Sequence, residues 1–225
     1  MSEFSKYAYI RRRGRTTSAQ AKALEGDLAE YTVRLEDLRT LSSSLYGIEI
    51  GFGMGDALVL WAKERAEEEK GLLGVDLYLP GVGSLVNKLT TQDIKNVQIC
   101  VEPAQEVVGN LPEDCLQEVR ILFPDPWPKK RHAKRRLIQP DFVAELARAL
   151  TLQGVVRLAT DWAPYAEWMK EVLAQEPRLR IEVDRIRAPD EVGLRRETTK
   201  FESRGEKLGH DIYDLVLIRQ EMRDH

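Results

Sequence analysis

Short runs of consecutive apolar residues alternate with segments of helical periodicity along most of this chain, and this alternation limits the possible folds. Strands are predicted at residues 47–52, 72–78, 97–101, 119–125, 154–160 and 179–186. Helices are predicted between them, at residues 56–70, 83–92, 141–150 and 163–175. Continuous apolar strands that alternate with helices are typical of a mostly parallel sheet with both faces covered.

The last apolar run, residues 212–220, has no helix after it. A strand reached without a long crossover predicts an antiparallel partner in an otherwise parallel sheet. Residues 47–225 are therefore expected to form one doubly wound, Rossmann-like α/β domain. Residues 1–46 are expected to form a basic N-terminal arm and a weakly helical segment, with arginines at positions 11, 12, 13 and 15.

The charge of the chain is unevenly distributed. The net charge of −3 argues against a nucleic-acid partner, but salt screens charges beyond about 8 Å, so the local pattern decides. Between Pro128 and Gln139, where a helix is predicted, six basic residues cluster, here called the basic run: Lys129, Lys130, Arg131, Lys134, Arg135 and Arg136. Like charges four residues apart repel, so a polyanion such as nucleic acid is the expected partner.

A glycine-rich loop follows the first predicted strand, in "IEIGFGMGD". Gly51, Gly53 and Gly55 lie where the strand gives way to a helix, and glycine lets the backbone approach a ligand closely. The dinucleotide fingerprint G-x-G-x-x-G is not completed, because Asp56 occupies the position of its third glycine. The alternative to a nucleotide site is a tight turn without a ligand.

Two acidic residues near this loop indicate the charge of its ligand. Glu49 precedes the glycines, and Asp76 ends the next strand, where a carboxylate accepts bonds from ribose hydroxyls. A carboxylate beside the loop suits a cationic ligand and not a pyrophosphate. The pattern favours S-adenosyl-L-methionine over NAD, and the other reading of Asp76 is a helix cap.

Asp125 lies in "FPDPWP", at the end of the fourth predicted strand. Ligands of open α/β sheets bind beyond the carboxyl ends of the strands, so Asp125 is expected close to a transferable methyl group. Pro124 and Pro126 fix φ on both sides of it and stiffen the loop. Trp127 offers either a flat face for a base or a plug that packs the loop.

Six stretches together carry a resemblance to a known family: residues 11–25, 49–55, 80–85, 123–137, 159–169 and 199–215. In content and order they resemble the bacterial tRNA (guanine-N7-)-methyltransferase family. The resemblance implies a class I methyltransferase fold that transfers a methyl group from S-adenosyl-L-methionine to N7 of a guanine. The family's substrate is guanine 46 in the variable loop of tRNA.

The resemblance also implies site residues. The cofactor would be held by Glu49, Gly51, Gly53, Gly55, Asp76, Glu102, Pro103, Ala104 and Asp125. The guanosine or its neighbours would be contacted by Lys129, Asp161, Thr199, Lys200, Phe201 and Glu202. Asp125 would be the catalytic residue. Where the family has an acidic residue before an alanine, this chain has Pro103, which lacks an N–H, so Glu102 is the candidate to contact the adenine.

This chemistry explains which residue types the chain lacks. N7 of guanine already carries a lone pair, so no base must create the nucleophile, and the chain has no Ser/His/Asp set and only three histidines. Methylation leaves the purine cationic, and a fixed carboxylate stabilises that charge as it develops. The base must be turned outward to reach such a pocket. The basic run and the N-terminal arginines would hold phosphates.

Three alternative functions share some features with this sequence. An amino-methyltransferase would carry Asp/Asn-Pro-Pro-aromatic, and "DPW" lacks the second proline. An NAD-dependent oxidoreductase is opposed by Asp56 and Glu49. An RNA-binding protein that keeps the methyltransferase fold but has lost catalysis is favoured only by Pro103. No apolar stretch reaches the ~18 residues of a membrane span, so a cytoplasmic protein without membrane or metal partners is expected, either a monomer or a homodimer.

Overall fold

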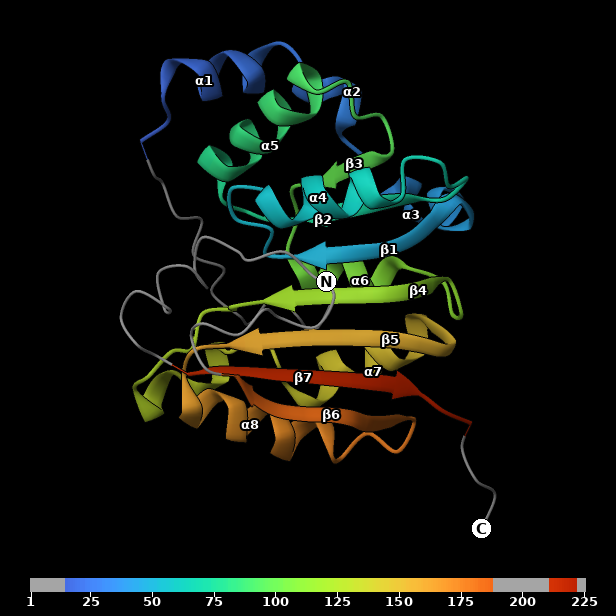
Figure 1. Ribbon diagram of the computed structural model, residues 1–225, viewed down its shortest axis with the longest axis vertical. Helices are drawn as coiled ribbons and strands as arrows, with labels where there is room; N and C mark the ends of the chain where they lie inside the picture. Colours follow the sequence, from blue (N-terminus) through green and yellow to red (C-terminus); the bar gives the residue numbers. More distant parts are fainter. Residues whose placement is uncertain (1–14, 188–210, 222–225) are drawn as a thin grey trace. The chain divides into compact units, whose positions relative to one another are not determined.

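The computed structural model describes residues 15–187 and 211–221. The chain divides into two compact units, Met1–Leu111 and Pro112–His225 (Figure 1). Each unit has its own strands and helices and its own set of buried apolar side chains. The predicted division into an arm at 1–46 and a domain at 47–225 stays a prediction.

Three parallel strands form the sheet of the first unit, in the order β3-β2-β1. They are β1 (Leu45–Ile50), β2 (Gly71–Val75) and β3 (Val97–Cys100). The helices after them are α4 (Asp56–Glu64), α5 (Leu79–Thr91) and α6 (Ala104–Asn110). Ile50 pairs with Val75, and Val75 with Cys100, so the carboxyl ends of the three strands lie at one edge.

The N-terminal segment of this unit is a series of short helices. They are α1 (Ser18–Glu25), α2 (Leu28–Tyr31), η2 (Leu35–Asp37), α3 (Leu38–Leu41) and η3 (Ser42–Ser44). Thr17 and Gln20 cap the start of α1 reciprocally, and Gly26 ends it. α1 packs along α5 (Figure 1), and a Cβ added at Gly83 of α5 would lie 2.6 Å from the carbonyl oxygen of Gln20.

Four strands form the sheet of the second unit, in the order β4-β5-β7-β6. They are β4 (Leu116–Leu122), β5 (Leu150–Thr160), β6 (Leu179–Arg187) and β7 (Ile212–Arg219). The helices are η4 (Lys130–Arg135), α7 (Pro140–Ala149) and α8 (Ala163–Leu173). β4 and β5 are parallel, whereas β7 is antiparallel to both β5 and β6, which confirms the predicted antiparallel last strand.

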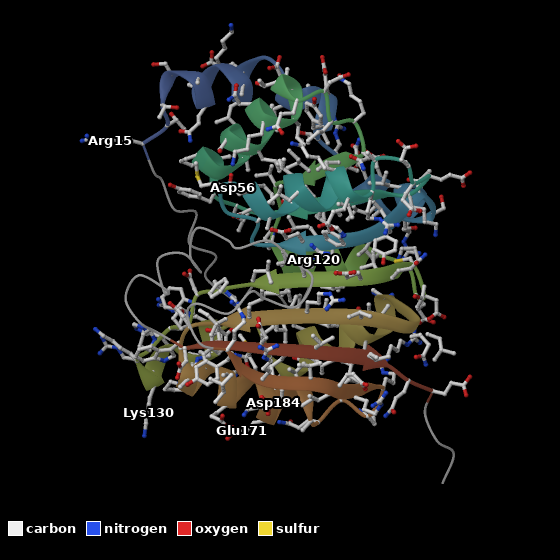
Figure 2. The ribbon with its side chains drawn as sticks, in the orientation of Figure 1. Arg15, Asp56, Arg120, Lys130, Glu171 and Asp184 are labelled. Carbon is white, nitrogen blue, oxygen red and sulfur yellow. The ribbon has the colours of Figure 1, made fainter. Side chains whose placement is uncertain are left out.

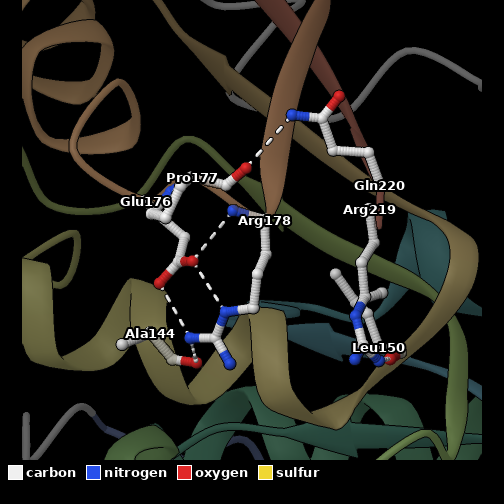
Figure 3. A network of polar contacts seen from close by, with 7 residues as sticks. All are labelled: Ala144, Leu150, Glu176, Pro177, Arg178, Arg219 and Gln220. Carbon is white, nitrogen blue, oxygen red and sulfur yellow. Dashed lines mark hydrogen bonds and ion pairs between the residues drawn. The ribbon is translucent and has the colours of Figure 1, made fainter. Parts of the chain in front are cut away.

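A polar network joins α7 to the outer strands of this unit (Figure 3). Arg178 donates from Nε and Nη2 to the Glu176 carboxylate, at 2.7 and 2.8 Å, and from Nη2 to the carbonyl oxygen of Ala144, at 3.0 Å. The side-chain amide of Gln220 donates to the carbonyl oxygen of Pro177. The Arg178–Ala144 bond therefore ties the start of β6 to α7, and the Gln220–Pro177 bond ties the end of β7 to the segment before β6, while the bidentate pair with Glu176 holds the Arg178 guanidinium in place.

Most predicted elements match the observed ones; the differences are in the end of one helix, in α6 and in the basic run, which is described below. The helix predicted at residues 56–70 ends at Glu64, with Arg65 as its C-cap. α6 was not predicted; it has seven residues, too few for a clear helical period. Among the described helices, none combines the length and apolar character that crossing a membrane requires.

Candidate functional site

The glycine loop joins β1 to α4 in a conformation that requires its glycines. Gly51, Gly53 and Gly55 have φ values of 75°, 57° and 80°, in the left-handed region that side chains disfavour. The N–H of Gly51 donates to the carbonyl oxygen of Val75 (2.7 Å), and that of Gly55 to the carbonyl oxygen of Phe52 (2.8 Å). The loop is therefore held at both ends by backbone bonds.

Asp76, the second acidic residue of the predicted cofactor set, binds this loop directly. Its Oδ2 accepts the N–H of Gly53 at 2.8 Å, and its Oδ1 accepts the N–H of Tyr78 at 2.9 Å. The structure thus brings Asp76 and the glycine loop together, while their binding of a cofactor stays a prediction. Because each carboxylate oxygen has two acceptor sites, Asp76 can also accept a ligand hydroxyl.

The start of α5 packs against the glycine loop, a contact that was not predicted from the sequence. A Cβ added at Gly81 would lie 2.0 Å from the carbonyl oxygen of Gly53. The Ser84 hydroxyl and the Lys88 ammonium both donate to the carbonyl oxygen of Met54, at 3.1 and 2.7 Å, and Lys88 also pairs with Asp56. Glycine inside a helix weakens it, so "PGVGSL" signalled a close packing contact.

The glycines differ in what surrounds them. A Cβ added at Gly51 would meet nothing within 4 Å, whereas one at Gly55 would lie 2.7 Å from Leu85. Gly51 therefore leaves open space beside the loop, and Gly55 allows α4 and α5 to pack closely. Glu49, in β1, is buried with 2% of its surface exposed.

The segment after β3 carries the remaining cofactor residues predicted in this unit. Pro103 is the N-cap of α6 and Ala104 its first residue, while Glu102 is half-buried between Pro103 and the strand end. Burial, and then the Glu102 carboxylate, raise the pKa of Cys100 to about 12. The Cys100 thiol is consequently neutral, and it packs as a small buried residue at the end of β3.

In the second unit, two predicted site aspartates lie at one edge of the strands. Leu122 of β4 pairs with Ala159 of β5, and both strands are parallel. Asp125 and Asp161 follow their carboxyl ends by three and one residues, and Asp125 is exposed while Asp161 is half-buried. The register of the sheet thus places both carboxylates at the edge where α/β proteins bind ligands.

The loop that carries Asp125, residues 123–128 and here called the Asp125 loop, has a strained backbone. Phe123 and Trp127 have φ values of 54° and 44°, although both are bulky residues. The Trp127 ring contacts His132 edge-on, with centroids 5.8 Å apart, and Cζ of Arg135 lies 5.2 Å from its centroid. Of the two roles proposed for Trp127, the structure shows packing, with the ring against two side chains of η4.

The basic run does not form the predicted helix. Residues Lys130–Arg135 form a 3-10 helix, η4, and Arg136 is extended, because repulsion among like charges opposes a regular α-helix. Five members of the run are exposed, and Lys130 points away from the ribbon (Figure 2). Arg136, interpreted from the sequence as a phosphate contact, is buried with 9% of its surface exposed.

His132 lies within the basic run and adds no charge to it at pH 7. Its pKa is held below the usual value by desolvation and by the positive charges of Arg135, Arg131 and Lys129. Lys129, a predicted substrate contact, is exposed at the N-cap of η4. The exposed cations around His132 therefore form a positively charged surface from lysine and arginine alone.

The predicted substrate residues Thr199, Lys200, Phe201 and Glu202 lie outside the described residues, as do Arg11, Arg12 and Arg13. The neighbouring strands still show where the chain enters and leaves this region. Arg187 pairs with Ile212, and Thr160 with Tyr213, so both ends of the segment are at the edge that carries Asp161. Nε of Arg187 donates to Oδ2 of Asp214 at 2.9 Å, and this ion pair is buried.

Comparison with known proteins assigns the family. The sequence model of a family described as "putative methyltransferase" matches residues 43–215. A tRNA (guanine-N(7)-)-methyltransferase of Acidovorax sp. (strain JS42) is 43% identical over 220 residues, which are 95% of this chain and 86% of that protein. The chain belongs to the tRNA (guanine-N7-)-methyltransferase family. A further family member, from Marinobacter nauticus, is 38% identical over 94% of this chain and 91% of its own length.

Solved structures support the fold expected for this guanine-N7 methyltransferase family. The 16S rRNA methyltransferase KamB superposes with a TM-score of 0.60 at 15% identity, covering 83% of this chain and 92% of that one. A 16S rRNA (adenine(1408)-N(1))-methyltransferase from Catenulisporales acidiphilia gives a TM-score of 0.57 at 14% identity, covering 86% and 94%. The predicted Rossmann-like methyltransferase fold is thereby confirmed.

Proposed function

We propose that this protein transfers a methyl group from S-adenosyl-L-methionine to N7 of guanine 46 in the variable loop of tRNA. The observation that carries the proposal is the 43% identity with a tRNA (guanine-N(7)-)-methyltransferase over 95% of the chain. The glycine loop of the first unit and the carboxylates of the second unit supply the residue types that this reaction needs.

The glycine loop fits the cofactor. Gly51 leaves open space beside a backbone that only glycine adopts readily, and the half-buried Asp76 carboxylate next to it can accept ribose hydroxyls. Gly53, Gly55, Glu49 and the segment 102–104 complete the proposed cofactor-binding set. When bound, S-adenosyl-L-methionine supplies an electrophilic methyl group, and the chain has to orient the guanine toward it.

Asp125 and Asp161 are the proposed guanine-binding carboxylates. Guanine offers N1–H and N2–H₂ as donors, which a carboxylate accepts and which adenine does not match. Orientation of reacting atoms contributes as much as ~7–11 kcal/mol to such reactions, so the fixed loop that carries Asp125 is suited to the task. The same carboxylate would stabilise the positive charge that develops on the purine.

The exposed part of the basic run is the proposed tRNA phosphate contact. Its lysines and arginines extend from η4 and the residue before it, in the unit that carries Asp125 and Asp161. Such contacts give affinity and orientation but carry little sequence information. Lys129 and residues 199–202 are proposed to contact the guanosine, while the cytoplasmic location and the oligomeric state stay predictions.

The test of this proposal separates cofactor binding from methyl transfer. Asp125→Ala is expected to bind S-adenosyl-L-methionine as wild type does and to lose most methyl transfer to tRNA. Asp141→Ala, an equal charge change at the exposed start of α7, is the matched control and should keep wild-type turnover. Full turnover by Asp125→Ala would remove this carboxylate from the mechanism. A wild-type protein that binds tRNA without methylating it would instead indicate an RNA-binding function.

A further inference from the structure

Arg136 is the buried member of the basic run. Its exposed fraction is 9%, whereas Lys130, Lys134 and Arg135 around it are exposed. Its Nε donates to the carbonyl oxygen of Pro126 at 2.9 Å. Pro126 directly follows Asp125, so the guanidinium is turned toward the backbone of the Asp125 loop.

Two aromatic side chains of α8 flank the Arg136 guanidinium. Cζ of Arg136 lies 5.1 Å from the ring centroid of Tyr165 and 5.3 Å from that of Trp168. Planar guanidinium groups stack favourably on aromatic rings, and a lysine ammonium in the same place would not reproduce both contacts. Arg136 therefore connects the Asp125 loop to α8, the helix that begins two residues after Asp161.

The backbone beyond Arg136 is fixed to the same helix. The indole Nε1 of Trp168 donates to the carbonyl oxygen of Ile138 at 2.8 Å, and the Tyr165 hydroxyl oxygen accepts the N–H of Ile138 at 3.4 Å. The Gln139 side-chain amide donates to the carbonyl oxygen of Arg136. These bonds fix the backbone at and after Arg136.

The Asp125 loop depends on such external contacts. Pro124 and Pro126 have no N–H to donate, and the left-handed φ values of Phe123 and Trp127 are unfavourable for residues with a Cβ. The N–H of Phe123 donates to the carbonyl oxygen of Ala159 at 2.8 Å, which fixes the start of the loop. Arg136 fixes its middle, one residue after the carboxylate.

We infer that Arg136 is a positioning residue for methyl transfer, which holds the Asp125 carboxylate in place by clamping Pro126 against α8, and that it is not a tRNA phosphate ligand. This inference rests on the proposed function. It separates the basic run by role: the exposed lysines and arginines bind the polyanion, and the last arginine orders the catalytic loop.

Arg136→Lys and Arg136→Met test this role. Arg136→Lys keeps the positive charge, and Arg136→Met keeps most of the length without it. Because misplacement by about 1 Å can cost about 100-fold in rate, both variants are expected to lower kcat by about 10- to 100-fold. The KM for tRNA and the slope of log binding constant against log salt should stay at the wild-type values, since no phosphate contact is lost.

A second variant tests the same clamp without any change of charge. Trp168→Leu removes the ring beside Arg136 and the bond to Ile138, so it should also lower kcat with an unchanged salt slope. Lys134→Met, on the exposed face, is the positive control for a lost phosphate contact, and its slope should fall by about 0.7–0.9. Circular dichroism and equilibrium binding of S-adenosyl-L-methionine establish that each variant is folded.

Each outcome decides the question. A reduced salt slope in Arg136→Met, with wild-type kcat in Arg136→Lys, would make Arg136 a phosphate ligand and overturn the inference. If both Arg136 variants fail to fold, wild-type kcat in Trp168→Leu overturns it, and a lowered kcat with wild-type slope supports it. Failure of the wild-type protein to form 7-methylguanosine would refute the proposed function instead, so the two failures are distinguishable.

Discussion

Gly81→Ala is expected to weaken cofactor binding although Gly81 is outside the predicted cofactor set. A Cβ at this position would lie 2.0 Å from the carbonyl oxygen of Gly53, well inside the normal contact distance of about 3.5 Å. The Gly53 peptide must therefore move by more than about 1 Å, or α5 must move away from the loop. Gly53 also donates to Asp76, so either movement disturbs the proposed ribose site.

The magnitude follows from the cost of overpacking. Inserting a methyl group into a well-packed site costs about 1–3 kcal/mol, and here the neighbour is backbone and not a side chain that could rotate away. Because binding requires the original loop conformation, this cost appears in the cofactor affinity. At about 1.4 kcal/mol per factor of ten, the dissociation constant for S-adenosyl-L-methionine should rise about 5- to 150-fold.

Isothermal titration calorimetry with S-adenosyl-L-methionine measures this change, and Gly109→Ala is the matched control. Gly109 lies in α6, and a Cβ there would meet nothing within 4 Å. This control should keep the wild-type affinity and gain up to about 1 kcal/mol in the free energy of unfolding, because alanine favours a helix. Wild-type affinity in Gly81→Ala would refute the argument that α5 sets the shape of the glycine loop.

Three further predictions follow from other parts of the structure. Lys130→Ala and Arg131→Ala should each reduce the salt slope of tRNA binding by about 0.7–0.9, and unchanged slopes would make the basic run a merely solvated surface. The hydrogen bonds from Arg178 hold the pKa of Glu176 below its ordinary value, so the stability that this pair contributes is fully present above the ordinary value and is lost as the pH falls through the lowered pKa. In urea unfolding, Glu176→Gln should accordingly have a lower free energy of unfolding than wild type at pH 7, and the two values should become equal at acidic pH. The same difference at both pH values would contradict this. Because burial raises the pKa of Cys100 to about 12, its thiol should resist alkylation at pH 8 until urea unfolds the protein. Rapid labelling of Cys100 in the folded protein would contradict the burial of this thiol.

The fold was predictable because buried parallel strands are continuous apolar runs. Every strand was expected within a few residues of its observed position, and the antiparallel direction of β7 was expected as well. The proximity of Asp76 to Gly53 could also be inferred from the sequence, because adjacent parallel strands end at the same edge of the sheet. These features depend on periodicity and strand order, which the sequence contains directly.

Features that depend on which way one side chain points were not predictable. Arg136 is the same residue type as its neighbour Arg135, and only its partners Pro126, Tyr165 and Trp168, two of them about 30 residues away, turn it inward. The basic run was wrongly expected to be a regular helix because its ends carry helix signals, while charge repulsion decides the conformation between them. Tertiary contacts therefore decide the orientation of Arg136, and repulsion between neighbouring charges decides the conformation of the basic run.

The contact between α5 and the glycine loop could be predicted only in part. Two glycines in "PGVGSL" signalled a close approach, but the partner could not be named from the sequence. The structure shows that Gly81 faces the Gly53 carbonyl and Gly83 faces Gln20 of α1. A glycine in a helix is thus evidence of packing, and only the fold identifies what packs there.

Methyl transfer from labelled S-adenosyl-L-methionine to an unmodified tRNA transcript, followed by nucleoside analysis, tests the proposed function most directly. Label in 7-methylguanosine is the predicted result, and a transcript with guanine 46 replaced should receive none. Label in another nucleoside would contradict the proposed substrate and the role of Asp125. No label, with the transcript still bound, would contradict the assignment as an enzyme.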